Sequence, residues 1–127
     1  MRSGNWRRSA FPAVVAGALL LHVGPVPAAS RSPAKSLNPV NDQLLKLPPS
    51  ERAARLARAV GHWCIGTNAF LMGVVTTGRG QGNAYWALRC VDGTDWAVQV
   101  DPLGEVTAID CDSFKEAGAG KECFKKF

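Results

Sequence analysis

The alternation of apolar and polar positions predicts β-strands in the second half of the chain. Apolar side chains recur at every second position from Ala84 to Cys90 and again from Trp96 to Val100. A period of two is typical of strands whose sheet has one buried face. Asp92-Gly93 and residues 101–104, Asp-Pro-Leu-Gly, stand where turns are expected. We therefore predict a three-stranded antiparallel meander over residues 83–111.

Residues 68–77 are expected to add a fourth strand to this meander. Phe70 and Met72 alternate with Leu71 there, and the segment ends in β-branched residues, which favour strands. The glycine-rich connection at 78–82 lacks the features of a nucleotide-binding loop. Asn83 stands where the dinucleotide pattern needs its third glycine, and no Gly-Lys-Ser/Thr is present. We therefore predict a flexible hairpin loop.

The length of the turn around Gly93 decides which side chains share a face of the sheet. A two-residue turn would set Cys90 opposite Ala97, whereas an odd-numbered loop over 92–94 exchanges the faces of one strand. We prefer the odd loop, with Gly93 or Thr94 in a bulge. The pairs that this loop predicts are Cys90 with Trp96, Leu88 with Val98, and Trp86 with Val100.

One amphipathic helix is predicted ahead of the strands, over about Pro49 to Gly61. Its start has a proline and an acidic residue in the first turn, and glycine is a common helix stop. Apolar residues at spacings of three and four form one stripe: Ala53, Leu56, Ala57, Val60 and Trp63. The opposite face carries Arg52, Arg55 and Arg58, which we interpret as a solvated row; anion or lipid-headgroup binding is the alternative.

These elements predict an α+β domain in which one helix packs on a four-stranded antiparallel meander and disulfides staple the fold. The C-terminal segment, with a short helical turn capped by Asp112, is expected to fold back. The predicted core consists of Leu56, Val60, Phe70, Met72, Trp86, Leu88, Trp96, Val98, Val100 and Ile109.

The first 28 residues are typical of a secretory signal peptide. A basic start with three arginines precedes an apolar run over 10–23, and small residues at Val26 and Ala28 favour cleavage after Ala28. The run has about 14 residues, whereas a membrane span needs about 20. We predict a flexible linker over 29–47, with a short turn at Leu44 to Leu47, and a domain over 48–127. The mature chain is then periplasmic or secreted and has no transmembrane span.

The signal peptide also accounts for most of the net charge. The chain has 15 basic and 10 acidic side chains, and removing the three arginines of the leader lowers its net charge from +5 to +2. No segment interleaves basic and aromatic residues as a nucleic-acid surface would. We therefore expect no nucleic-acid partner.

The four cysteines favour two disulfides over a metal site. They are Cys64, Cys90, Cys111 and Cys123, and the 25, 20 and 11 residues between them match no zinc pattern. Antiparallel pairing brings Cys64 near Cys90, whereas Cys90 and Cys111 lie two strands apart, about 9–10 Å, beyond the roughly 7 Å limit for a bridge. Cys64–Cys90 with Cys111–Cys123 is our preferred pairing, and Cys64–Cys123 with Cys90–Cys111 is the next.

No set of residues assembles a recognisable catalytic or cofactor site. His62 lies beside Cys64, and a thiol–imidazole pair could act as a nucleophile, but no third group orients the base. The aspartates lack the spacing of a calcium loop, and turns and caps account for them. We therefore predict no catalytic residue, no cofactor and no metal.

The order of helix, strand and meander resembles a PepSY-type module. The similarity rests on the strand Ala84 to Arg89, the Asp92-Gly93 turn, the strand Trp96 to Asp101 and the following Leu103 to Val106, within about Ser50 to Ile109. The chain also resembles small exported proteins of alphaproteobacteria. The resemblance implies a periplasmic α+β binding or inhibitory module without a catalytic residue.

Three functions follow as hypotheses. The first is a non-catalytic module that binds a protein or peptide through a free sheet edge or the hairpin loops. The second is a thiol-dependent enzyme or redox protein that uses Cys64 and His62. The third is a structural envelope component held by the arginine face and the basic tail.

Overall fold

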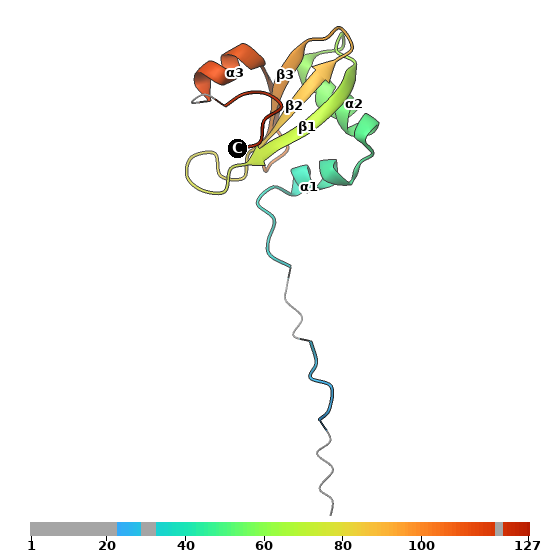
Figure 1. Ribbon diagram of the computed structural model, residues 1–127, viewed down its shortest axis with the longest axis vertical. Helices are drawn as coiled ribbons and strands as arrows, with labels where there is room; N and C mark the ends of the chain where they lie inside the picture. The colour runs from blue at the N-terminus through green and yellow to red at the C-terminus, as the bar shows by residue number, and fades with distance from the viewer. Residues whose placement is uncertain (1–22, 29–32, 119–120) are drawn as a thin grey trace, which may run out of the picture. The chain divides into compact units, whose positions relative to one another are not determined.

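A computed structural model describes residues 23–28, 33–118 and 121–127 of the chain, and residues 33–127 form one unit (Figure 1). Its elements are α1 (Pro39–Lys46), α2 (Pro49–Val60), β1 (Gly66–Val74), β2 (Ala84–Cys90), β3 (Asp95–Val100), β4 (Val106–Asp110) and α3 (Cys111–Ala117). The strands form one antiparallel sheet in the order β1-β2-β3-β4. The predicted α+β meander is thus confirmed, with three helices instead of one. The predicted signal peptide lies mostly outside the described residues, and no described helix is long and apolar enough to cross a bilayer.

Helix α2 covers one face of the sheet with its predicted apolar stripe, except for Trp63, which lies beyond the helix and is 49% exposed. Ala53, Leu56 and Ala57 are buried, and Gly61 ends the helix with its N–H bonded to the carbonyl of Ala57. The strand residues that pack beneath α2 include Leu71, Ala84, Trp86, Leu88, Cys90, Val98 and Val100. This face forms the larger of the two cores.

The opposite face is covered by α3 and the C-terminal segment, which lie across the sheet from α2 (Figure 1). Its core contains Met72, Ala87, Ala97 and Phe114, with Phe70, Tyr85, Ile109, Cys123 and Phe124 packed around them. The prediction of a single core is therefore wrong, because both faces of the sheet are buried. Phe70, Met72 and Ile109 belong to the second core, on the face away from α2. Phe70 pairs with Ala87 and Ile109 with Ala97, so both lie on this face. A bulge follows in β1, where Leu71 pairs with Trp86 and Gly73 with Tyr85, which leaves Met72 without a partner.

Helix α1 lies inside the range predicted as a flexible linker. Asn38 caps this helix by accepting a hydrogen bond from the N–H of Asn41, and Pro39 occupies its first turn. The Nδ2 of Asn38 also donates to the carbonyls of Gly82 (2.8 Å) and Val100 (2.9 Å). The chain therefore joins the domain ten residues earlier than the predicted start at 48, because these buried polar contacts hold α1 to the end of the sheet.

The β2–β3 turn has an odd number of residues, as predicted, but begins one residue earlier. The N–H of Cys90 donates to the carbonyl of Thr94, so the loop consists of residues 91–93, and Gly93 takes the positive φ of 85°. Leu88 consequently pairs with Trp96, and Trp86 with Val98. The predicted pairs are wrong by two residues, whereas the predicted faces are confirmed because a two-residue shift preserves them.

Two disulfides join the predicted cysteines. Cys64 is bonded to Cys90 with 5.3 Å between their Cα atoms, and Cys111 to Cys123 with 5.8 Å. The second disulfide anchors the segment after α3. The cap of α3 is Asp110, which accepts from the N–H of Ser113, and not Asp112 as predicted.

Candidate functional site

Strand β1 forms one edge of the sheet and presents unpaired backbone groups. The N–H of Cys90 donates across the β2–β3 turn, so the backbone of Cys90 faces β3. Because these directions alternate along a strand, Ala87 faces β1, where it pairs with Phe70. The residues on either side of Phe70, which are Ala69 and Leu71, therefore direct their N–H and C=O groups away from the sheet. The prediction of a free sheet edge thus applies to this stretch.

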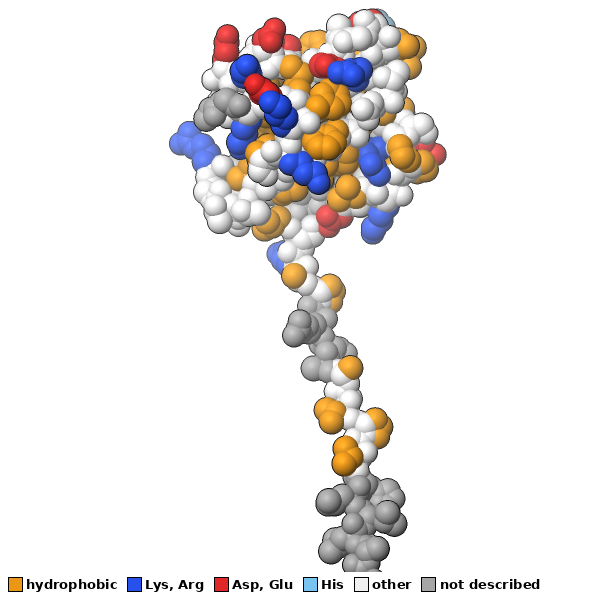
Figure 2. All heavy atoms as spheres, in the orientation of Figure 1, with side chains coloured by type: hydrophobic (Ala, Val, Ile, Leu, Met, Phe, Trp, Pro, Cys, Tyr) orange, Lys and Arg blue, Asp and Glu red, His pale blue; other side chains and the backbone are white. Residues whose placement is uncertain are grey.

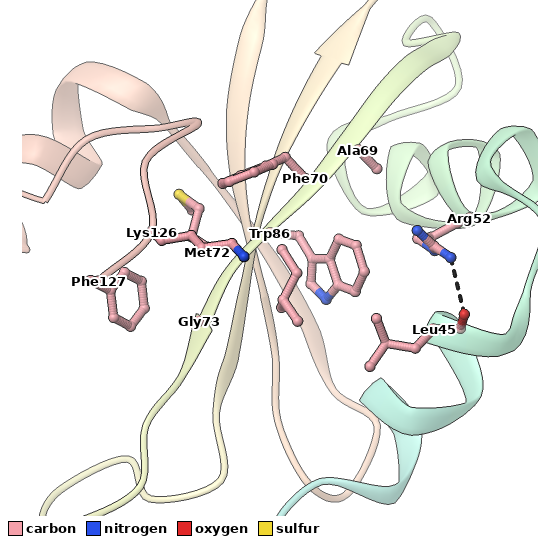
Figure 3. A pocket seen from close by; sticks show the side chains of 10 residues that line it. Leu45, Arg52, Ala69, Phe70, Met72, Gly73, Trp86, Lys126 and Phe127 are labelled. Carbon is pink, nitrogen blue, oxygen red and sulfur yellow. Dashed lines mark hydrogen bonds between the residues drawn. The ribbon is translucent and has the colours of Figure 1, made fainter.

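A groove of about 560 Å³ runs along this edge. Its floor is β1 with Trp86 of β2, and its lining residues are Leu45, Arg52, Ala69, Phe70, Leu71, Met72, Gly73, Trp86, Lys126 and Phe127. Figure 3 shows Leu45 and Arg52 on one side and Lys126 and Phe127 on the other. Figure 2 shows hydrophobic side chains gathered on the face around β1, with Lys and Arg side chains about them. The volume of the groove lies in the usual range for ligand sites. Five consecutive residues of β1, Ala69 to Gly73, line it, so the groove follows the direction of the strand.

The helical side of the groove is built by Arg52, which the sequence placed in a solvated row. Its Nε donates to the carbonyl of Leu44 (3.0 Å), and its Nη2 donates to the carbonyls of Leu45 (3.0 Å) and Leu47 (2.9 Å). Leu44 and Leu45 belong to the last turn of α1 and Leu47 is its C-cap, where carbonyls lack the usual partner of a helix interior; the carbonyl of Leu44 also accepts from the N–H of Leu47 (3.1 Å). The guanidinium also lies 5.4 Å from the ring centre of Trp86, which is 1% exposed. Arg52 therefore locks α1, α2 and the groove floor together, and the prediction for it is corrected.

The other side of the groove is built by the C-terminal residues. The N–H of Phe127 donates to the carbonyl of Met72 (3.2 Å), so Phe127 already bonds to the outer edge of β1 at the bulge. Its ring lies against Gly73, where an added Cβ would be 2.9 Å from it, and 5.9 Å from the ring of Tyr85. The ammonium of Lys121 lies 3.8 Å from the centre of the same ring. This packing leaves about half of Phe127 exposed to the groove and solvent.

The groove has positive charge and no acidic lining residue. Its charged lining residues are Arg52 and Lys126. The nearby Glu122 is bonded to both Lys115 (3.2 Å) and Lys125, and these contacts, chiefly the hydrogen bond from Lys125, lower the pKa of its carboxyl. Lys126 is therefore a cationic side chain of the groove that has no side-chain ion pair among the described residues.

Of the residues that the sequence suggested for chemistry, the cysteine is engaged in a disulfide and the histidine lies at the surface. Cys64 is bonded to Cys90, so a thiol-dependent mechanism would require reduction of that disulfide, and His62 is exposed. In the described part of the chain no three metal-binding side chains cluster. Asp92 and Asp101 accept hydrogen bonds from turn N–H groups, as expected of turn residues.

Sequence reasoning anticipated a free edge but not the residues that flank it. Arg52 and Leu45 belong to helices whose mutual packing depends on the C-terminal carbonyls of α1, and α1 itself was not predicted. The Asn38-Pro39 pair is the signal that could have found it, since a cap residue followed by proline marks a helix start. Lys126 and Phe127 reach the groove only because the Cys111–Cys123 disulfide and the packing of Phe124 turn the tail back.

Comparison with known proteins adds no relative. No protein-family model, curated protein or solved structure matches this chain. The resemblance to PepSY modules therefore stays a prediction, and function rests on the geometry of the groove.

Proposed function

We propose that this protein is an exported, non-catalytic binding module that receives an extended segment of another polypeptide along the outer edge of β1. The observation that supports this proposal is the coincidence of two features. Ala69 and Leu71 direct unpaired backbone groups outward, and both residues line the apolar groove. Addition of a strand to a sheet edge uses these two features together, since backbone hydrogen bonds align the strand and side-chain contacts select it.

The energetics explain why the apolar floor matters as much as the free edge. Ala69 and Leu71 offer four backbone groups, and each hydrogen bond contributes about 0.5–1.5 kcal/mol net. Their sum, about 2–6 kcal/mol, does not reliably offset the roughly 4–15 kcal/mol cost of association. Burial of about 300 Å² of apolar surface would add about 8 kcal/mol. Phe70, which is half-buried, and Leu45, which is 45% exposed, would contribute part of this surface, and the incoming segment would contribute the rest.

The other sheet edge fits this role less well. Strand β4 has five residues, whereas β1 has nine. Short edge strands protect a sheet against unwanted pairing. The bulges at Gly66/Asn68 and Leu71/Gly73 limit the regular part of β1 to its middle, so the incoming segment is expected to be short.

The two disulfides support an exported location, periplasmic or secreted, because disulfides persist in oxidising compartments. In such a compartment a binding module meets unfolded or extended segments of other exported proteins. A module that pairs with backbone needs no cofactor.

Selection from a random peptide library displayed on phage tests the proposal. Peptides enriched on the wild-type domain are then measured against Ala69→Pro and Ala69→Ser. Proline removes the outward N–H and leaves the hydrogen bonds between β1 and β2 in place, whereas serine keeps that N–H. We expect Ala69→Pro to weaken binding at least about tenfold, equivalent to about 1.4 kcal/mol, and Ala69→Ser to bind as wild type does. Circular dichroism must show both variants folded. Equal binding by Ala69→Pro, or no enrichment of any peptide, would contradict the proposal.

A further inference from the structure

We infer that the segment received by the β1 edge is acidic, with carboxylate side chains alternating with apolar ones. This inference rests on the proposed function and specifies the chemistry of the partner. It follows from the charges and the apolar surfaces that lie on the two sides of the groove.

A strand beside β1 would direct successive side chains to the two sides of the groove in turn. On the helical side they would meet the apolar side chains of Leu45 and Leu71. On the C-terminal side they would meet Lys126 and Phe127. An alternating segment can therefore place apolar side chains against the helices and carboxylates toward the tail.

The two cations of the groove differ in how far their charge is already compensated. Arg52 donates to the carbonyls at the end of α1, where the helix dipole is negative, so part of its charge is balanced. The segment 121–127 has three lysines and one acidic residue, Glu122, which bonds Lys115 and Lys125. Lys126 is exposed and has no ion pair among the described residues. The C-terminal side is thus the side that favours a carboxylate.

The same charges disfavour a second copy of this chain as the occupant. Pairing β1 with β1 of another copy would bring two grooves of like charge together, and like charges across an interface cost free energy. An acidic strand would instead be attracted to the positive charge of the groove. Its attraction is to partly exposed cations, so the expected gain is moderate and sensitive to salt.

Fluorescence anisotropy with three labelled octapeptides tests the inference. The peptides alternate valine with glutamate, glutamine or lysine, so that glutamine is the neutral match of glutamate. At low ionic strength we expect the valine–glutamate peptide to bind about fivefold more tightly than valine–glutamine, and valine–lysine to bind most weakly. The preference should fall as salt is raised to about 0.5 M, where the screening length is only a few ångströms.

Two substitutions that remove the same charge serve as a matched pair. Lys126→Gln should reduce the preference for glutamate to about half, whereas Lys35→Gln, at an exposed position outside the groove lining, should leave it unchanged. Equal binding of the glutamate and glutamine peptides would overturn the inference. So would equal binding of the glutamate peptide to Ala69→Pro, since the charge would then act away from the edge.

The outcomes separate this inference from the proposed function. If all three peptides bind alike and Ala69→Pro abolishes every one, the edge site stands and the acidic preference falls. If none binds, the inference falls, and the phage selection decides the edge site independently. A dimer seen in sedimentation and dissolved by Ala69→Pro would overturn the inference in favour of a second copy.

Discussion

Replacing Asn38 with alanine should destabilise the domain strongly, although Asn38 lies in a stretch that the sequence identifies as a linker. The side chain is 2% exposed and makes three hydrogen bonds, of 2.8, 2.9 and 2.8 Å. Loss of a helix cap costs about 1 kcal/mol. Loss of the donors to Gly82 and Val100 leaves two buried carbonyls without this partner, at about 1–2 kcal/mol each. We therefore expect Asn38→Ala to cost about 3–5 kcal/mol, a large part of the 5–15 kcal/mol typical of a domain.

Urea unfolding with both disulfides intact, followed by tryptophan fluorescence, measures this cost. Trp86 is a suitable reporter because its Nε1 donates to the Oδ1 of Asn41 in α1 (2.9 Å). Asn38→Ser serves as the matched variant, since serine retains a cap but cannot donate to both carbonyls, and its loss should be intermediate. A free energy of unfolding within about 0.5 kcal/mol of wild type, the range of ordinary surface substitutions, would show that α1 is not docked and that the linker interpretation was right.

Three further predictions concern the rest of the fold. Gly66→Ala should cost about 1–3 kcal/mol in the same unfolding assay, because its Cβ would lie 2.4 Å from the carbonyl oxygen of Ala53, and an unchanged midpoint would refute this close approach of β1 and α2. Replacing Cys111 and Cys123 with serine should cost about 3 kcal/mol from the loop of 12 residues, and an equal stability of this variant would contradict an anchored tail. The N–H at the start of α3 lowers the pKa of Asp110, so its carboxylate stabilises the fold above about pH 4 and this contribution disappears as the pH falls through the lowered pKa. Thermal unfolding should therefore show the advantage of wild type over Asp110→Asn shrinking between about pH 5 and pH 2, and a difference independent of pH would show that the charge does not contribute.

Local and topological features of the fold could be predicted from the sequence because they depend on periodicity and on strand spacing. The disulfide pairing followed from the distance between neighbouring and next-neighbouring strands. The faces of β2 and β3 followed from the odd turn. The register of β2 against β3 could not be predicted in this way. The loop is 91–93, with Gly93 in the left-handed conformation as its third residue, and the alternation of apolar residues does not distinguish this loop from the predicted loop 92–94.

The features that shape the site depend on contacts between distant residues, which the sequence pattern does not reveal. The bulge at Met72 places Met72 and Gly73 on the same face, which a period of two cannot predict. Arg52 has the polarity of a solvated residue, yet its partners are backbone carbonyls of another helix, and these carry no sequence signal. Sequence alone therefore predicted the sheet and its free edge, while the flanks of the groove required the structure.

Amide hydrogen exchange by NMR tests the central claim most directly, because it reports on the backbone groups that the claim requires. The amides of Ala69 and Leu71 face outward and should exchange quickly in the free protein. Saturation with a peptide recovered from the display selection should slow their exchange at least about tenfold, since both would then be hydrogen-bonded. The amide of Ala108, which faces outward from β4 at the other edge of the sheet, should stay unchanged. Unaltered exchange at Ala69 and Leu71 while the peptide is bound would show that the partner does not pair with β1.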